Sequence, residues 1–191
     1  MKTFKRLNLV ICLAVTLAGW LPLGLLGAGS AQAQDFESKK IVPFVPTPQE
    51  VVDKMIELAG VKKGDVVYDL GSGDGRIVIA AAKKGARAVG FDIDGDLVKE
   101  SRENVRKAGL QDLAEIRQQD FLTVDLSAAS VVTMYLLPDV NMMLRPKLLN
   151  QLKPGSRVVS HAFDMGDWKP DMTERVNGRN IYLWSIPANG R

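Results

Sequence analysis

The chain has 191 residues, of which 46% are hydrophobic and 25% are charged, a composition typical of one globular domain. Its single cysteine excludes a disulfide framework and any multi-cysteine metal site, and its single histidine, His161, argues against a His-rich metal site and a Ser-His-Asp triad. Three of the 25 basic side chains, Lys2, Lys5 and Arg6, precede residue 34, and without them basic and acidic side chains balance at 22 each. We therefore expect neither a metal nor a nucleic acid as a partner.

Residues 1–33 have the three parts of a secretory signal peptide. Lys2, Lys5 and Arg6 form a positive start, an apolar stretch follows from residue 7 to about residue 26, and Ala31-Gln32-Ala33 supplies the small residues that signal peptidase needs. Because the apolar stretch approaches the ~20 residues that span a bilayer, an uncleaved membrane anchor is the alternative. The positive end stays inside in either case, so we expect the domain to be exported across, or anchored to, a bacterial inner membrane.

Residues 34–47 form a Pro-containing lead-in to the first helix. We expect that helix to have Thr47 as its N-cap, Pro48 in its first turn and Glu50 completing a capping box. Apolar residues then recur at helical spacing, and Gly60 ends the helix.

From residue 48 to residue 191 short apolar segments alternate with amphipathic ones, which predicts one α/β domain built from parallel βαβ units. The expected parallel strands are 66–70, 88–92, 113–117, 129–136 and 157–160, and the expected helices are 76–84, 95–108 and 139–152. Two more strands, 173–176 and 180–186, flank Asn177-Gly178, a dipeptide that favours a type I′ hairpin turn. The pattern therefore predicts a mainly parallel, Rossmann-like sheet of seven strands, with helices on both faces and a C-terminal antiparallel hairpin.

The first expected strand runs into Asp69-Leu70-Gly71-Ser72-Gly73-Asp74-Gly75, whose glycines permit a tight turn and close approach of the backbone to a ligand. A dinucleotide fingerprint would require glycine at position 76, where this chain has Arg76. Asp69 and Asp74 would repel a pyrophosphate but suit a ligand that carries ammonium and sulfonium groups. The spacing D-x-G-x-G-x-G resembles the motif with which class I methyltransferases bind S-adenosylmethionine. This resemblance implies a cofactor site at Asp69, Gly71, Gly73, Asp74 and Gly75.

Two more acids follow the next two expected strands, and the carboxyl ends of parallel strands meet at one edge of a sheet. Asp92 lies 21 residues after Gly71, close to the ~20 expected for an acid that binds ribose hydroxyls. In class I methyltransferases an acid after the third strand binds the adenine amino group and the next residue lies along the ring, which implies these roles for Asp120 and Phe121. Asp94 is expected instead to complement the dipole of the following helix.

Further segments resemble the lysine methyltransferases that modify the adenine nucleotide translocase and the c subunit of ATP synthase. Two are specific to that family, Pro43-Phe44-Val45-Pro46 and Tyr135-Leu136-Leu137-Pro138, and three more match it, at 76–78, 157–160 and 168–170. The resemblance covers about two-thirds of the chain. It implies a class I methyltransferase fold, S-adenosylmethionine as cofactor, and methyl transfer to a lysine of a partner protein, including a partner at a membrane. The leader departs from the family's mitochondrial targeting segment because its pattern is bacterial and secretory.

The methyl acceptor is expected at the end of the fourth strand, in an open cleft formed by Pro43, Phe44, Pro46, Tyr135 and Pro138. Such a cleft suits a protruding lysine better than a small metabolite that needs enclosure. The candidate catalytic residues are Tyr135, whose ring can lie beside the lysine stem, and His161, as a general base. Enzymes that methylate amino groups of DNA carry D/N-P-P-Y at this strand end, and residues 133–138 lack that pattern.

Two other functions remain open at this point: a small-molecule methyltransferase, and an exported protein of the same fold that binds a ligand without turnover. Export also conflicts with the cytosolic source of S-adenosylmethionine, so retention on the cytosolic side is the alternative location. The chain after residue 120 has no insertion large enough for a lid or a second domain, and we expect a monomer.

Overall fold

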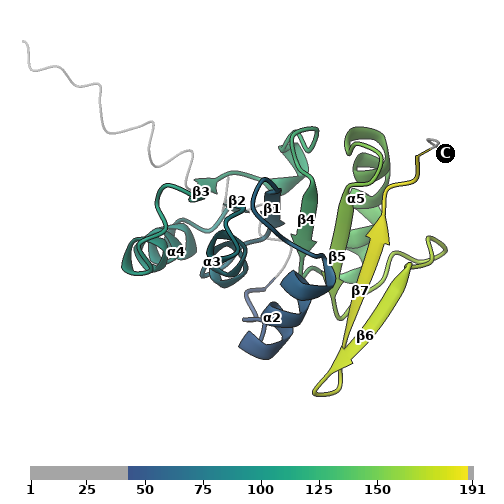
Figure 1. Cartoon of the computed structure of the whole chain (residues 1–191), viewed down its shortest axis with the longest axis horizontal. Coiled ribbons are helices and arrows are strands. Elements are labelled where there is room, and N and C mark those ends of the chain that lie inside the picture. The colour runs from purple at the N-terminus through teal and green to yellow at the C-terminus, as the bar shows by residue number, and fades with distance from the viewer. Residues whose placement is uncertain (1–42, 189–191) are drawn as a thin grey trace, which may run out of the picture.

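The computed structural model describes residues 43–188, which form one sheet with helices on both of its faces (Figure 1). The helices are α2 (Gln49–Leu58), α3 (Arg76–Lys83), α4 (Gly95–Lys107) and α5 (Pro138–Gln151), with a 3-10 turn, η1, at Phe121–Thr123. The strands are β1 (Val66–Leu70), β2 (Arg87–Asp92), β3 (Ala114–Gln118), β4 (Val131–Met134), β5 (Arg157–His161), β6 (Met172–Val176) and β7 (Arg179–Ser185). The predicted signal peptide or anchor, 1–33, and the lead-in up to residue 42 lie outside the described residues.

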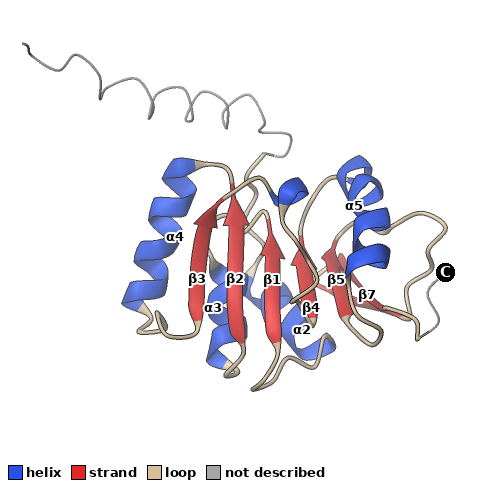
Figure 2. Ribbon diagram, turned by 90° about the horizontal axis from the view of Figure 1, so that it is seen from above, coloured by secondary structure: helices blue, strands red, loops and turns tan. Residues whose placement is uncertain are grey.

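The seven strands lie in the order β3-β2-β1-β4-β5-β7-β6. β1 pairs in parallel with β2 on one side and with β4 on the other, so the chain changes direction across the sheet at β1. Figure 2 shows the parallel strands side by side, with their carboxyl ends at one edge. In open sheets of this kind ligands bind at that edge, beside the switch point. The predicted mainly parallel sheet is therefore confirmed.

The C-terminal hairpin is also confirmed. β7 pairs antiparallel with both β5 and β6. Asn177 and Gly178 join β6 to β7 with φ angles of +48° and +81°, the left-handed conformation that a type I′ turn requires at both positions.

Two apolar cores, one on each face of the sheet, explain why the central strands are continuous apolar runs. Val67, Val131 and Val159 belong to the core beneath α2, α3 and α4. Their neighbours Tyr68 and Val132 belong to the core beneath α5. Figure 1 shows α2, α3 and α4 on one face and α5 on the other. Because successive strand residues alternate between covered faces, every residue of β4 and all but the first residue of β1 and of β5 are buried.

The start of the first helix differs from the prediction, and the expected capping box is wrong. Pro48 occupies the N-cap position of α2, and no side chain caps that end. The buried Thr47 hydroxyl instead lies 3.2 Å from Nδ1 of His161. Glu50 accepts a 3.0 Å hydrogen bond from Nδ2 of Asn177 in the hairpin turn. Tertiary partners therefore bind both side chains that the local pattern assigned to the cap.

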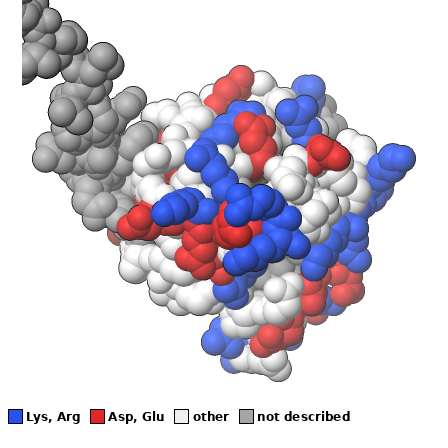
Figure 3. All heavy atoms as spheres, turned by 90° about the vertical axis from the view of Figure 1, so that its left-hand side faces the viewer, with Lys and Arg blue, Asp and Glu red and all other residues white. Residues whose placement is uncertain are grey.

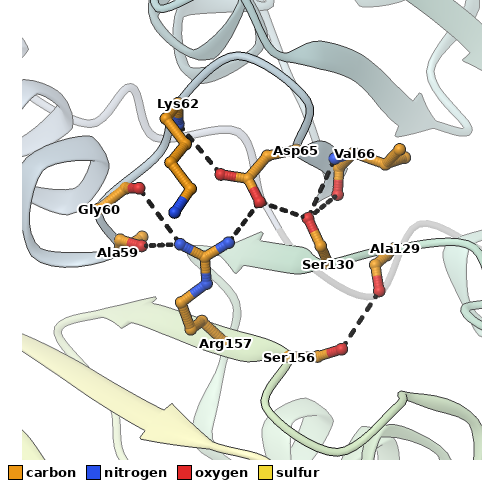
Figure 4. A network of polar contacts seen from close by, with 9 residues as sticks. All are labelled: Ala59, Gly60, Lys62, Asp65, Val66, Ala129, Ser130, Ser156 and Arg157. Atoms are coloured by element: carbon orange, nitrogen blue, oxygen red, sulfur yellow. Dashed lines mark hydrogen bonds and ion pairs between the residues drawn. The ribbon is translucent and has the colours of Figure 1, made fainter.

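Arg157 ties α2, β1 and β5 together at the edge of the sheet opposite the strand carboxyl ends (Figure 4). Its Nη1 donates to the carbonyl oxygens of Ala59 and Gly60, at 2.6 and 3.2 Å, and its Nη2 to Oδ1 of Asp65 at 2.5 Å. Ser130 also donates to that carboxylate, at 2.8 Å. Burial raises the pKa of Asp65, but hydrogen bonds from Ser130 and a backbone amide, with Arg157, hold it below its usual value. We call this group the Arg157 clamp.

The face formed by α4 and β3 carries many basic side chains with acidic ones among them (Figure 3). Glu103 forms ion pairs with Arg106 and Lys107 on α4. Glu115 pairs with Arg117 on β3. Acidic side chains therefore lie paired with basic ones on this face.

Candidate active site

A cavity of about 420 Å³ opens at the carboxyl ends of β1, β2 and β4, in the size range of sites for small molecules. Five segments far apart in the sequence form its wall: residues 43–47, the glycine loop after β1, the turn into α4, η1 and the residues after β4. Most of the predicted site residues line it, namely Pro43, Phe44, Pro46, Asp69, Gly71, Gly73, Asp74, Asp92, Asp120, Phe121 and Tyr135. Gly75, Pro138 and His161 lie outside this wall, because Gly75 caps α3, Pro138 begins α5 and His161 is buried.

The glycine loop has a backbone conformation that residues with a side chain rarely adopt. Gly71, Gly73 and Gly75 have φ angles of +75°, +52° and +82°. A β-carbon at Gly73 would lie 2.3 Å from a ring carbon of Phe44. Residues 43–47, which we call the strap, therefore lie directly against the loop, and only glycine at position 73 permits this approach.

Asp69 is a buried acid with one oxygen left unpartnered. It is 2% exposed, and its Oδ1 accepts a 2.7 Å hydrogen bond from the Thr133 hydroxyl on β4. Its Oδ2 is buried and has no hydrogen-bond partner among residues 43–188. Burial, opposed by the hydrogen bond from Thr133 and helped by the carboxylates of Asp92 and Asp74, raises the pKa of Asp69 to about 7. A buried, unpaired carboxylate oxygen on a cavity wall fits a cationic donor such as an ammonium group.

Asp74 forms an ion pair within the loop. Its Oδ1 accepts from Nε of Arg76 at 2.9 Å, and its Oδ2 from Nη2 at 2.5 Å. The same guanidinium donates from Nη1 to the carbonyl oxygen of Thr47 at 2.6 Å. The charge of Asp74 is therefore balanced by Arg76, and this ion pair holds the strap against the glycine loop.

Asp92 lies at the carboxyl end of β2 and joins two backbone segments. Its Oδ2 accepts from the amide of Gly73 at 2.8 Å, and its Oδ1 from the amide of Asp94 at 3.0 Å. Burial raises its pKa, against these amide hydrogen bonds. Asp94 is the N-cap of α4, accepting from two amides of the first turn, so its expected role at the helix start is confirmed.

The third acid lies at the start of η1. Asp120 accepts a 2.9 Å hydrogen bond from the amide of Leu122, and the neighbouring Phe121 is buried on the cavity wall. Ile93 and Leu97, which the sequence pattern did not single out, also line the cavity. The sequence could have indicated Ile93, because it follows Asp92 just as Phe121 follows Asp120. Apolar side chains beside carboxylates suit a flat base that carries polar edges.

Tyr135, His161 and Phe163 form an aromatic group at the carboxyl ends of β4 and β5. The ring centroids of Tyr135 and His161 lie 3.9 Å apart, and those of Tyr135 and Phe163 lie 6.3 Å apart with nearly parallel planes. His161 is 1% exposed and lies outside the cavity wall, while Tyr135 lines it. Burial, with a smaller effect of the Arg179 charge, lowers the pKa of His161 to about 4. A neutral, enclosed imidazole is a poor general base for an amine.

Comparison with known proteins agrees with this geometry. Residues 69–172 match the model of the ANTKMT methyltransferase domain. A protein-lysine N-methyltransferase of Saccharolobus islandicus is 48% identical over 151 residues, which cover 76% of this chain and 94% of that protein. The human lysine N-methyltransferase named for the c subunit of ATP synthase is 34% identical, over 90% of this chain and 76% of its own length.

A solved structure of a similar protein indicates the cofactor. The crystal structure of an RNA methyltransferase from Salinibacter ruber, in complex with S-adenosyl-L-homocysteine, superposes with a TM-score of 0.74. The two chains are 59% identical, and the match covers 76% of this chain and 95% of the other. Class I geometry, an acid-lined cavity at the switch point and these relatives lead to one conclusion. The chain belongs to the family of the ANTKMT methyltransferase domain and is an S-adenosylmethionine-dependent methyltransferase.

Proposed function

We propose that this methyltransferase acts on the side-chain amine of a lysine in a partner protein. The observation that carries the proposal is the make-up of the cavity wall, where Asp69, Asp92 and Asp120 occur together with the strap and Tyr135. Phe44 on the strap is 47% exposed, so an aromatic side chain of this wall is open to solvent. Aromatic rings pack well against an alkyl stem and attract a cationic head. The names of the protein-lysine methyltransferase relatives support the same acceptor.

In this proposal three acids hold the cofactor. Asp69 Oδ2 accepts its ammonium, Asp92 its ribose hydroxyls, and Asp120 its adenine amino group, with Phe121, Ile93 and Leu97 packing on the base. The bound cofactor supplies a methyl group on a sulfonium, a leaving group that is already activated. The protein therefore contributes mainly by positioning the two reactants.

The acceptor lysine must enter as a neutral amine, although its usual pKa is ~10.4. The apolar strap residues favour the neutral form by excluding water from the ammonium. His161 lies outside the cavity wall and remains neutral, so we assign it no proton-transfer step. The proton is lost to solvent as the lysine enters.

We further propose that the partner is a membrane protein and that the enzyme works as a monomer at the cell envelope. Val45 lines the cavity and Leu137 follows the lining residue Leu136, and both are exposed apolar side chains that suit an apolar partner. The leader pattern of residues 1–33 supports export or anchoring. Among residues 43–188 no helix is long and apolar enough to cross a membrane.

The test uses S-adenosylmethionine labelled in its methyl group, added to envelope protein, total RNA and a small-molecule extract of the host cell. We expect label in the envelope protein, and no label when Asp69→Ala replaces the wild-type enzyme. RNA is included because the Salinibacter ruber relative is described as an RNA methyltransferase. Label only in RNA or only in small molecules would contradict the lysine proposal, and label in none would favour a ligand-binding protein without turnover.

A further inference from the structure

The single histidine of the chain joins two walls of the active-site opening. Nδ1 of His161 lies 3.2 Å from the hydroxyl of Thr47 on the strap, and the ring lies 3.9 Å, centroid to centroid, from Tyr135. Thr47 and Tyr135 both line the cavity, whereas the imidazole lies behind them, 1% exposed. A hydroxyl both donates and accepts, so a neutral imidazole makes this hydrogen bond in either tautomer.

A strained turn holds His161 and Phe163, whose ring stacks on the ring of Tyr135. Ala162 has a φ angle of +68°, and the amide of Phe163 donates to the carbonyl oxygen of His161 at 2.9 Å, which closes a three-residue turn. The fully buried Asn141 donates from Nδ2 to the carbonyl oxygen of Phe163 at 3.2 Å, and Ser160 donates to the same oxygen at 2.7 Å. Strain of this kind persists only where surrounding contacts enforce it, and it concentrates at functional sites.

The strap depends on this contact for its placement over the glycine loop. Thr47 is 4% exposed and is held at two points, its hydroxyl by His161 and its carbonyl oxygen by Arg76. Three residues earlier, the Phe44 ring lies against Gly73. A displacement of Thr47 therefore moves the aromatic ring at the opening.

We infer that His161 is a positioning residue, which joins Thr47 to Tyr135 and thereby fixes the two aromatic walls, Phe44 and Tyr135, between which the acceptor amine enters. This inference rests on the proposed methyl transfer to a protein amine. It assigns His161 a role in acceptor use and none in cofactor binding, because the acids that face the cofactor are on other segments. It also accounts for an imidazole that is buried beside an active site.

The first test compares Thr47→Val, which removes the hydroxyl at nearly constant volume, with Thr47→Ser, which keeps it. The full chain is assayed with labelled S-adenosylmethionine and a concentration series of solubilised host envelope protein. We expect Thr47→Val to lower kcat/KM for the envelope protein by about tenfold or more without changing the Kd for S-adenosylmethionine. Thr47→Ser should restore most of the lost rate, and Thr173→Val, at an exposed threonine of β6, should change neither quantity.

The result that would overturn the inference is a wild-type kcat/KM in folded Thr47→Val, or an equal loss in Thr47→Ser. A fall in cofactor affinity matching the fall in rate would also overturn it, because the contact would then support the cofactor site. Absence of label with the wild-type enzyme would contradict the proposed function instead.

The second test detects the contacts of His161 with Thr47 and Tyr135 and needs no acceptor protein. The chain has one histidine, so the imidazole NMR signals of the untagged full chain need no assignment. We expect these signals to move in Thr47→Val and in Tyr135→Leu, which removes the ring current, and to stay constant between about pH 6 and pH 8 in the wild type. Imidazole signals that stay in place in both variants, or that titrate with the usual histidine pKa, would overturn the inference.

Discussion

At the scale of single residues, Asp69 links cofactor binding to pH. Its pKa is raised to about 7 chiefly by burial, so near neutral pH part of the unliganded protein carries a protonated Asp69. A cationic cofactor favours the ionised form, and binding should therefore release a proton and strengthen as pH rises through 7. Titration calorimetry in two buffers of different ionisation enthalpy measures the released proton. Asp69→Asn should abolish the release, and an equal release in that variant would assign it to another group.

The same shift has a consequence for stability. Because the folded pKa of Asp69 lies above its unfolded value, its contribution to the free energy of unfolding is present at low pH and is lost as pH rises towards 7. His161 acts in the opposite sense, since its pKa is lowered to about 4 and its burial costs stability as pH falls from about 6.5 towards 4. The two effects overlap, so only the difference between Asp69→Asn and the wild type isolates Asp69. Urea unfolding of both at about pH 5 and pH 7.5 should show the variant losing less stability as pH rises.

Asp92 and Asp94 are two residues apart, but their replacement by alanine should affect cofactor affinity very differently. Asp92→Ala removes a carboxylate assigned to the ribose, where charged hydrogen bonds are worth ~1.5–3 kcal/mol each, and should weaken S-adenosylmethionine binding at least about tenfold. Asp94→Ala should mainly cost the cap of α4, about 1 kcal/mol of folding stability. Calorimetric titration measures the first effect and urea unfolding the second. Equal losses of affinity would show that the wrong acid was assigned.

At the scale of elements, the Arg157 clamp joins α2, β1 and β5 on the side away from the cavity. Arg157→Met leaves the nearly buried Asp65 without its cationic partner and should lower the free energy of unfolding by about 2–4 kcal/mol. The matched control is Arg106→Met, which breaks an exposed ion pair on α4 and should cost less than about 1 kcal/mol. Urea midpoints compare the two variants. Similar small losses would mean that the clamp does not stabilise the fold.

The elements themselves were largely predictable from the sequence, because apolar runs and glycine stops are local signals. Gly60 ends α2 and Asn177-Gly178 makes the hairpin, as expected, since both adopt positive φ. The contact that replaces the expected Thr47 cap was not predictable, because the partner of the Thr47 hydroxyl, His161, lies 114 residues away. The fourth strand is Val131–Met134, shorter at both ends than predicted, because the apolar run continues into the cavity wall at Tyr135 and Leu136.

The cofactor side was more predictable than the acceptor side for the same reason. Three acids at three strand ends follow from the strand order and the loop motif, and Asp69, Asp92 and Asp120 do line one cavity. His161 follows β5 in the sequence as well, yet its burial depends on the strap and on the ring of Tyr135. Contacts between segments so far apart leave no local pattern.

At the scale of the whole molecule, one cavity at the carboxyl edge of the sheet brings the three acids together with the strap and Tyr135. The strap, at the N-terminal end of the described chain, covers the glycine loop, and the residues after β4 form the opposite wall. The central claim is that the methyl group passes through this opening to a lysine amine.

The most direct measurement of that claim is the chemical identity of the methylated residue. Host envelope protein labelled by the full chain is hydrolysed completely, and the amino acids are separated beside methylated standards. We predict label in N-methylated lysine, which disappears when Asp69→Ala replaces the wild type. Label in another residue, such as methylated arginine or a methyl ester, would contradict the claim.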